Sequence, residues 1–161
     1  MSTQDRSDLA APISDRYFED YVPGAVCVYG DIAMTEANIV EFARRYDPQL
    51  MHADPEAAQR GAFGGLIASG WHTVACVMKI LVEHYLSRVA AIVSPGIDEL
   101  RWTAPVRPGD VLHVRVTVEA ATPSRSKPDR GLVRTFIEAL NQRDEIVLTM
   151  RAMNLILRRG S

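Results

Sequence analysis

The sequence predicts an α+β fold in which one antiparallel β-sheet wraps around one long apolar helix. First, residues 70–85 are apolar on nearly every side, which indicates a helix buried over most of its surface. Second, the chain after this segment alternates apolar and polar residues in runs separated by turn sequences, as strands do. Third, no helical segment lies between those runs, which excludes the parallel βαβ arrangement.

Length and composition indicate one globular domain. The chain has 161 residues, of which 47% are hydrophobic and 24% charged, enough to bury a core. Residues 1–20 are polar and without a period, so we expect an N-terminal arm, either mobile or lying as a strap, followed by a single domain over 21–161. A net charge of −2 provides no field that would attract nucleic acid or anionic lipid, and neither is expected as a partner.

Several features predict a soluble protein of the cytoplasm. The longest apolar runs, such as 74–78 and 89–93, are too short to cross a bilayer, and residues 1–20 lack the apolar centre of a signal peptide. Cys27 and Cys76 lie in apolar surroundings without a CxxC spacing. They are interpreted as small buried hydrophobic residues in a reducing compartment.

The elements follow in order. Residues 25–32 are rich in β-formers and predict the first strand. Thr35 is predicted to cap a helix that ends near Tyr46, because Pro48 disfavours the helical conformation for the residue before it. Asp54 followed by Pro55 predicts the start of a short helix.

A glycine-rich segment leads into the long helix, and strands follow it. Gly61, Gly64, Gly65 and Gly70 predict a flexible, tightly turned entry into the helix at 70–85. Four further strands are expected at 96–103, 111–121, 131–140 and 145–157.

Asp47 and His52 are candidates for an acid–base pair. In a continuous helix their offset would separate the two side chains by roughly 140°, but Pro48 breaks the helix between them and allows them to converge. A carboxylate beside an imidazole is a common pair for proton transfer. Alternatively, Asp47 ends the helix through a side-chain turn and His52 is a polar residue of a connector. The capping role of Asp54 explains that residue fully.

The start of the long helix is the second candidate. The first amides of a helix have no partner within it and lie at the positive end of its dipole, so the backbone at Gly70 could polarise a carbonyl as an oxyanion hole does. The alternative is that Gly64, Gly65 and Gly70 only permit the turn and close packing. No spacing of His, Cys, Asp and Glu resembles a zinc site, and no loop fits a phosphate or dinucleotide motif.

Three separated blocks, YDPQLMHADPEAA, FGGLIASGWHT and GIDELRWTAPVRPGDVL, occur in this order and resemble the MaoC-like dehydratases, relatives of the (R)-specific enoyl-CoA hydratases. The resemblance runs from about 17 to 157 and implies a hotdog fold assembled as a homodimer. The family's hydratase motif is D-x-N-P-[LIV]-H, and the chain keeps its acid and base as Asp47 and His52. It departs at Gln49, where Asn is usual, and at Leu50, where Pro is usual.

The resemblance implies an acyl-CoA hydratase or dehydratase that reversibly adds water to a 2-enoyl-CoA, giving a 3-hydroxyacyl-CoA. Asp47 and His52 would act on the water, and the backbone at Gly70 would hold the thioester carbonyl. Gly65, Ser69 and Trp71, beside the helix start, are expected to bind substrate. Neither metal nor cofactor is expected, because the thioester itself makes the proton on C2 acidic.

Two basic residues of the segment PSRSKPDR, Arg125 and Lys127, are further candidates. They could meet the phosphates of CoA, and the alternative is a solvated hairpin tip.

Two other functions compete. A hotdog acyl-CoA thioesterase would need a carboxylate base, often on the long helix, where Glu83 is the only acid and lies near the far end. A non-catalytic acyl-CoA-binding or assembly protein would not require Asp47 and His52, and the presence of both argues against it.

Overall fold

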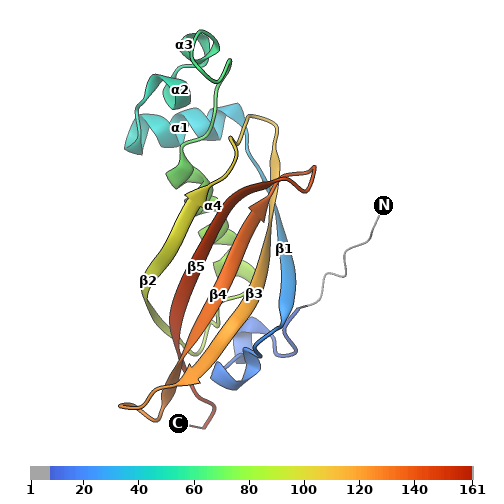
Figure 1. Ribbon diagram of the computed structural model, residues 1–161, viewed down its shortest axis with the longest axis vertical. Coiled ribbons are helices and arrows are strands. Elements are labelled where there is room, and N and C mark those ends of the chain that lie inside the picture. Colours follow the sequence, from blue (N-terminus) through green and yellow to red (C-terminus); the bar gives the residue numbers. More distant parts are fainter. Residues whose placement is uncertain (1–7, 161) are drawn as a thin grey trace.

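The computed structural model describes residues 8–160 and shows a five-stranded antiparallel sheet curved along one long helix (Figure 1). The strands are β1 (Val26–Ala33), β2 (Ala91–Trp102), β3 (Val111–Pro123), β4 (Arg130–Leu140) and β5 (Ile146–Leu157). Their order in the sheet is β1-β3-β4-β5-β2, which makes β1 and β2 the two edges. The predicted α+β architecture is confirmed.

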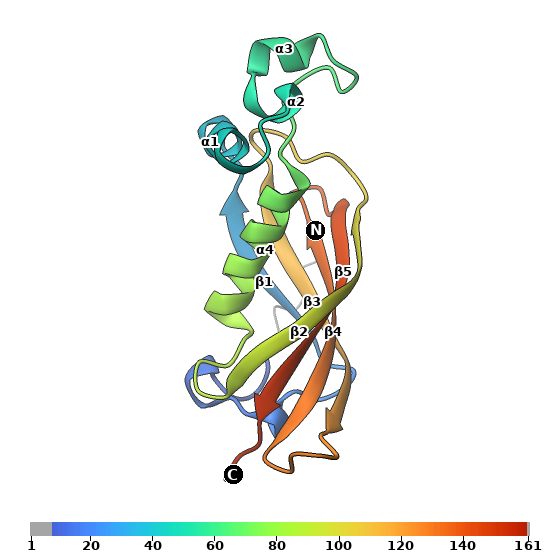
Figure 2. The same ribbon diagram turned by 90° about the vertical axis from the view of Figure 1, so that its left-hand side faces the viewer.

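The long helix is α4 (Gly70–His84), and it packs against β1 and β3. Figure 2 shows it running along one face of the sheet beside β1. Alternate residues of β3 are buried beneath it, as the alternation of the sequence predicted. The helix residues that are buried in this core are His72, Thr73, Cys76, Val77, Ile80 and Leu81.

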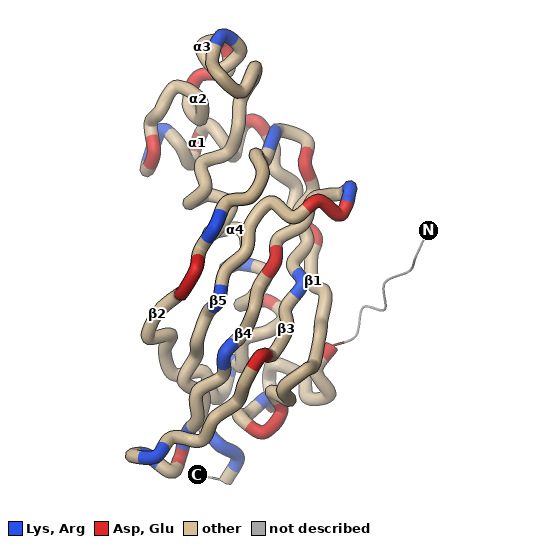
Figure 3. The backbone as a smooth tube through the Cα atoms, in the orientation of Figure 1, with Lys and Arg blue, Asp and Glu red and all other residues tan. Residues whose placement is uncertain are grey.

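The opposite face of the sheet carries charged residues that pair between strands. The pairs are Arg115–Glu138, Arg151–Glu119 and Arg134–Asp98, with N–O distances of 2.7, 3.1 and 3.7 Å. Figure 3 shows acidic and basic positions interspersed over these strands. This face is therefore the polar face of the sheet, and the apolar face packs against α4.

Three short helices form a cap at one end of the sheet (Figure 1): α1 (Glu36–Tyr46), α2 (Leu50–Ala53) and α3 (Pro55–Gln59). The Thr35 hydroxyl accepts a hydrogen bond from the Asn38 amide at 3.1 Å, which confirms the predicted start of α1. The Asp54 carboxylate accepts from the amides of Glu56 and Ala57 at 3.0 Å, which confirms the predicted start of α3. The single turn α2 was not predicted.

The N-terminal segment lies at the other end of α4. Two 3-10 turns, η1 (Ile13–Asp15) and η2 (Phe18–Asp20), flank Arg16, whose side chain is fully buried. Its guanidinium donates to the carbonyls of His84 and Tyr85 at 3.0 and 2.9 Å. Residues 8–20 thus lie as a strap, residues 1–7 of the predicted arm are outside the described range, and the division into arm and domain stays a prediction.

Strand β2 begins at Ala91, five residues before its predicted start at 96. Pro95 lies inside it, and a proline argues against a central strand. As an edge strand, β2 tolerates the proline where its pairing with β5 shifts register, between Val93 and Gly96.

None of the helices described is long and apolar enough to cross a membrane.

Candidate active site

Helix α1 ends at Asp47, whose side chain turns toward the start of α4. The Asp47 amide donates to the Ala43 carbonyl at 2.8 Å, so the backbone completes the last turn of the helix. Pro48 follows, and α2 then carries His52 inward. Asp47 therefore terminates the helix through its backbone, while its side chain is available for chemistry.

The side chains of Asp47 and His52 converge. Oδ2 of Asp47 lies 3.6 Å from Nε2 of His52, and the two side chains are 18% and 7% exposed. This separation is slightly too long for a direct hydrogen bond. It leaves both atoms able to contact one water molecule.

The Asp47 carboxylate is held by two donors. The Ser69 hydroxyl donates to Oδ2 at 2.6 Å, and the Gln49 side-chain amide donates to Oδ1 at 2.8 Å. These hydrogen bonds, that of Ser69 first, lower the pKa of Asp47 against the opposing effect of burial. The carboxylate is thereby kept ionised at neutral pH.

His52 is oriented through its other nitrogen. Nδ1 lies 2.8 Å from the Ile67 carbonyl oxygen, and a carbonyl can only accept, so Nδ1 carries the hydrogen. In the neutral ring Nε2 then bears the lone pair on the side of Asp47. The arrangement provides a base at Nε2.

A cavity of about 490 Å³ adjoins the pair, a size typical of small-molecule sites. Its buried lining consists of His52, Ile67, Ala68, Thr73, Val106 and Val147, and its exposed lining includes Gln49, Phe63, Trp71, Trp102, Thr103 and Pro105. Asp47 and Gly70 also line it. The site therefore combines an ionised acid, a base and a mostly apolar wall.

The first amides of α4 open onto this cavity. Ser69 occupies the N-cap position of the helix but makes no capping hydrogen bond, and its hydroxyl donates to Asp47. Within residues 8–160 the amides of Gly70 and Trp71 donate to no other group, whereas the His72 amide donates to the Ser69 carbonyl at 3.0 Å. Two free amides at a helix start can polarise an oxygen.

The remaining predicted residues fall into different places. Trp71 lines the cavity, whereas Ser69 contacts it only through Asp47 and Gly65 lies in the preceding loop, at φ +158°. Arg125 and Lys127 lie in the turn between β3 and β4, at the opposite end of the sheet from the helical cap (Figure 1). The geometry of one chain does not bring these two cations to the cavity.

Sequence reasoning missed much of the cavity lining, including Trp102 and Thr73, and it missed the Ile67 carbonyl that orients His52. A detectable signal existed only for Trp102, a large aromatic residue where β2 ends before Pro105. Nothing in the sequence marks a backbone carbonyl as the partner of a histidine.

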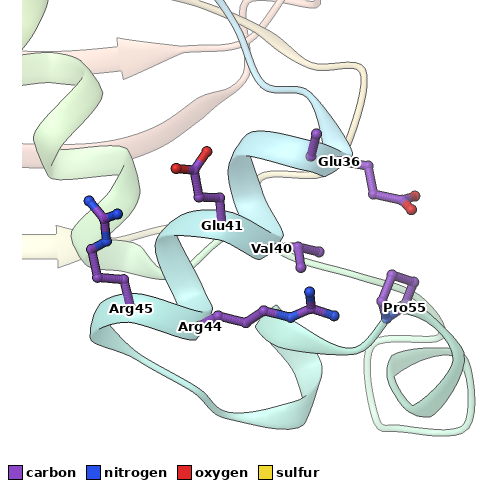
Figure 4. Close-up of a pocket in the computed structure, with 7 residues that line it drawn as sticks. Glu36, Val40, Glu41, Arg44, Arg45 and Pro55 are labelled. Atoms are coloured by element: carbon purple, nitrogen blue, oxygen red, sulfur yellow. The ribbon is translucent and has the colours of Figure 1, made fainter.

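A second, larger hollow of about 900 Å³ lies over α1 and α3 and contains none of the candidate residues. Figure 4 shows Arg44 extending from α1 toward Pro55, while Glu41 and Arg45 point away from Pro55. The lining of this hollow carries both acidic and basic side chains and no converging pair.

Among the described residues, no group of three or more His, Cys, Asp or Glu side chains is placed to hold a metal ion.

The curved antiparallel sheet around α4 defines a hotdog-fold protein, and comparison with known proteins gives the family. Residues 22–137 match the MaoC like domain. The chain belongs to this family.

Individual relatives agree. A crystal structure of the MaoC-like dehydratase from Rhodospirillum rubrum is 42% identical, with a TM-score of 0.84 over 91% of this chain and 99% of that one. The 3-hydroxybutyryl-CoA dehydratase of Methylorubrum extorquens is 30% identical over 69% of each chain. Protein MaoC of Klebsiella aerogenes is 32% identical over 66% of this chain, which spans only 32% of that longer protein.

Proposed function

We propose that the protein is an acyl-CoA hydratase or dehydratase, which reversibly adds water to a 2-enoyl-CoA to give a 3-hydroxyacyl-CoA. The observation that carries the proposal is the convergence of the Asp47 carboxylate and Nε2 of His52, 3.6 Å apart, beside the free amides of α4. Relatives named as dehydratases support the same reaction class.

The proposed mechanism assigns the water to the pair. Asp47 accepts a hydrogen bond from one O–H of the water, which keeps that hydrogen, and the lone pair on Nε2 of His52 removes the other proton as the oxygen bonds to C3. The electrons of the C2–C3 double bond move toward the thioester, forming an enolate. The protonated His52 then returns the proton to C2, which completes the addition and restores the neutral ring.

The start of α4 would stabilise the enolate. Its negative charge develops on the thioester oxygen, and the amide of Gly70 at the positive end of the helix dipole is a suitable donor. The acidity at C2 arises from the thioester, so we propose a reaction without metal or redox cofactor.

One assay separates this proposal from its rivals. Purified protein is mixed with crotonyl-CoA, and the absorbance of the conjugated thioester and the release of free thiol are followed together. Loss of conjugation without free thiol is the expected result. Free thiol would instead indicate a thioesterase, and the absence of any change with tight binding of the thioester would indicate a non-catalytic binding protein.

The structure gives a further reason to doubt a thioesterase. Glu83 lies in the last turn of α4, at the end away from Gly70, and it is ion-paired with Lys79. It is therefore not placed to direct water at a carbonyl held by the first amides of the helix.

We also propose that two copies associate through the apolar surface between α4 and β2. Exposed apolar side chains lie on both elements, namely Trp71, Met78, Val82, Val93 and Ile97, and no strand within residues 8–160 pairs with the outer edge of β2. Both features favour a partner that covers them. Light scattering after size-exclusion chromatography should show a dimer for the native protein and a monomer for Val82→Glu, whereas Val22→Glu, exposed elsewhere, should stay dimeric.

We propose a cytoplasmic location because the two cysteines form no disulfide. Cys27 and Cys76 are both buried and unpaired, and burial raises the pKa of the Cys76 thiol to about 11. Such thiols are inert small hydrophobic groups, as expected in a reducing compartment.

A further inference from the structure

Trp102 occupies the space where a side chain of Gly70 would lie. A β-carbon built on Gly70 would fall 2.4 Å from both Nε1 and Cε2 of the Trp102 indole, far inside the normal contact distance between such atoms. Sequence reasoning attributed the glycine either to the approach of a ligand or to close packing. The structure favours close packing as the reason for a glycine here, because the indole of Trp102 occupies the space of any side chain at position 70.

The indole also contacts the next residue of α4. The rings of Trp102 and Trp71 meet edge to face, with centroids 5.4 Å apart and an interplanar angle of 76°. Such aromatic pairs are worth about 1 kcal/mol beyond the area they bury. The end of β2 is thus joined to the first turn of α4 by one pair of side chains, both of which line the cavity.

Beyond this pair an apolar stripe continues along α4. Ala75, Met78 and Val82 follow Trp71 at helical spacing, so they lie on the same side of the helix as Trp71. Met78 and Val82 are 47% and 49% exposed, and every residue of β2 is exposed or half-buried. The Trp71–Trp102 pair therefore stands between the cavity and an apolar stripe along the helix, which is part of the surface proposed above to meet a second copy.

We infer that Trp102 determines the acyl-chain specificity, by ending the cavity beside Gly70 and restricting the enzyme to short acyl groups. The inference rests on the proposed function, because it takes the thioester carbonyl to lie at the Gly70 amide. From that point C2 and C3 extend toward Asp47 and His52. A longer tail that runs from this point along α4 must displace the indole.

The test compares two substrates on three proteins. Hydration of crotonyl-CoA and of 2-decenoyl-CoA is measured for the native protein, for Trp102→Ala and for Ile92→Ala, an exposed apolar residue of β2 that does not line the cavity. The native protein should prefer crotonyl-CoA. In Trp102→Ala the ratio of kcat/KM for 2-decenoyl-CoA over crotonyl-CoA should rise by about tenfold or more, since a few methylenes in an apolar pocket are worth that much, and Ile92→Ala should keep the native ratio.

A binding measurement separates the two possible failures. In Trp102→Ala the calorimetric affinity for decanoyl-CoA should rise relative to that for butyryl-CoA, both of which are saturated, whether or not the protein hydrates enoyl-CoA substrates. Absence of hydration by the native protein would sink the proposed function alone. An unchanged chain-length ratio in both turnover and binding would overturn the role of Trp102.

Folding of the variant is checked by circular dichroism. If Trp102→Ala does not fold, Trp102→Leu replaces it, since it keeps an apolar side chain and removes the indole. The same ratios then decide the inference.

Discussion

The two ends of α4 differ in how the backbone groups of the helix are used. At the carboxyl end, the carbonyls of His84 and Tyr85 accept hydrogen bonds from the buried Arg16, and Tyr85 also accepts from the Tyr21 hydroxyl at 3.0 Å. At the amino end, the Gly70 and Trp71 amides donate to no group among residues 8–160. The backbone carbonyls at the carboxyl end have hydrogen-bond donors and stabilise the fold, whereas the first backbone amides at the amino end are free to bind a ligand.

A buried serine at each end shows the same contrast. Ser87 donates to the Arg16 carbonyl and accepts from the amides of Val89 and Ala90, so it is fully engaged with the backbone. Ser69, equally buried, makes no capping bond and donates to the Asp47 carboxylate. Residues of one type therefore serve stability at one end and chemistry at the other.

The largest expected effect is at the amino end, on turnover. Asp47→Ala and His52→Ala should each lower kcat for hydration of crotonyl-CoA by roughly a thousandfold, because each removes a group that orients or deprotonates the attacking water. Steady-state kinetics on protein with a native circular dichroism spectrum would measure this. Asp54→Ala is the control, since it removes only the cap of α3 and should lose about 1 kcal/mol of stability with native turnover; full activity in either site variant would refute the assigned roles.

The next effect is at the carboxyl end, on stability. Arg16→Ala should lower the free energy of unfolding by about 3 kcal/mol, because it removes the donor to the carbonyls of His84 and Ala11 and one of the two donors to the Tyr85 carbonyl. Urea denaturation measures the change, and kcat of the folded fraction should stay native. Arg143→Ala, an exposed arginine ion-paired with Glu145, should change the free energy of unfolding by less than about 0.5 kcal/mol. A neutral result for Arg16→Ala would mean that water replaces the guanidinium.

The two serines give a matched pair of smaller changes. Ser69→Ala should raise the pKa of Asp47, since the Ser69 hydrogen bond is the main cause of its lowering, and should reduce kcat by about tenfold. Ser87→Ala should instead reduce the free energy of unfolding by about 1 kcal/mol and leave the pKa of Asp47 unchanged.

The readout for this pair is the ¹³Cγ chemical shift of Asp47 as a function of pH, together with urea denaturation. The lowered pKa means that the stability contributed by ionised Asp47 is present above its unfolded pKa and is lost as pH falls through the folded pKa. In Ser69→Ala that loss should be smaller and should be complete at a higher pH, because the folded pKa lies closer to the unfolded one. An identical titration in Ser69→Ala and the native protein would show that the hydrogen bond does not control the carboxylate.

The smallest expected effect is that of Gln49→Ala. Its amide is the second cause of the lowered pKa of Asp47, and it lies on the exposed side of the carboxylate. The pKa should rise in the same direction as in Ser69→Ala but by less, with a correspondingly smaller loss of kcat. A larger shift than that of Ser69→Ala would reverse the order of the two donors.

Much of the fold follows from local patterns in the sequence. Thr35, Asp54 and Pro55 mark helix starts, and the alternation of β3 and the continuous apolarity of 70–85 predict a sheet covered by a helix. These features depend on neighbours in the chain, which is why one sequence reveals them. The same holds for the break at Pro48 that frees the Asp47 side chain.

What the sequence did not reveal depends on distant partners. A polar segment containing Arg16 predicted an arm of unspecified contacts, because an arginine is normally exposed and two of its three carbonyl partners lie 68 and 69 residues away. The hydroxyl of Ser69, a residue predicted to bind substrate, donates to Asp47, which lies 22 residues earlier in the chain. The pairing of Gly70 with Trp102 likewise requires the folded sheet.

The order of strands bears on how the protein folds. Strands β3, β4 and β5 form consecutive hairpins, whereas β1 pairs with β3 and β2 with β5 across long stretches of chain. Short loops close faster than long ones, so we expect the three-stranded meander to form before the edge strands join it. Trp102 lies on an edge strand, and Asp47, His52 and Gly70 lie between the two edge strands in the chain. Enzymatic activity should therefore return after most of the sheet during refolding, which stopped-flow fluorescence and an activity assay on the same sample would show.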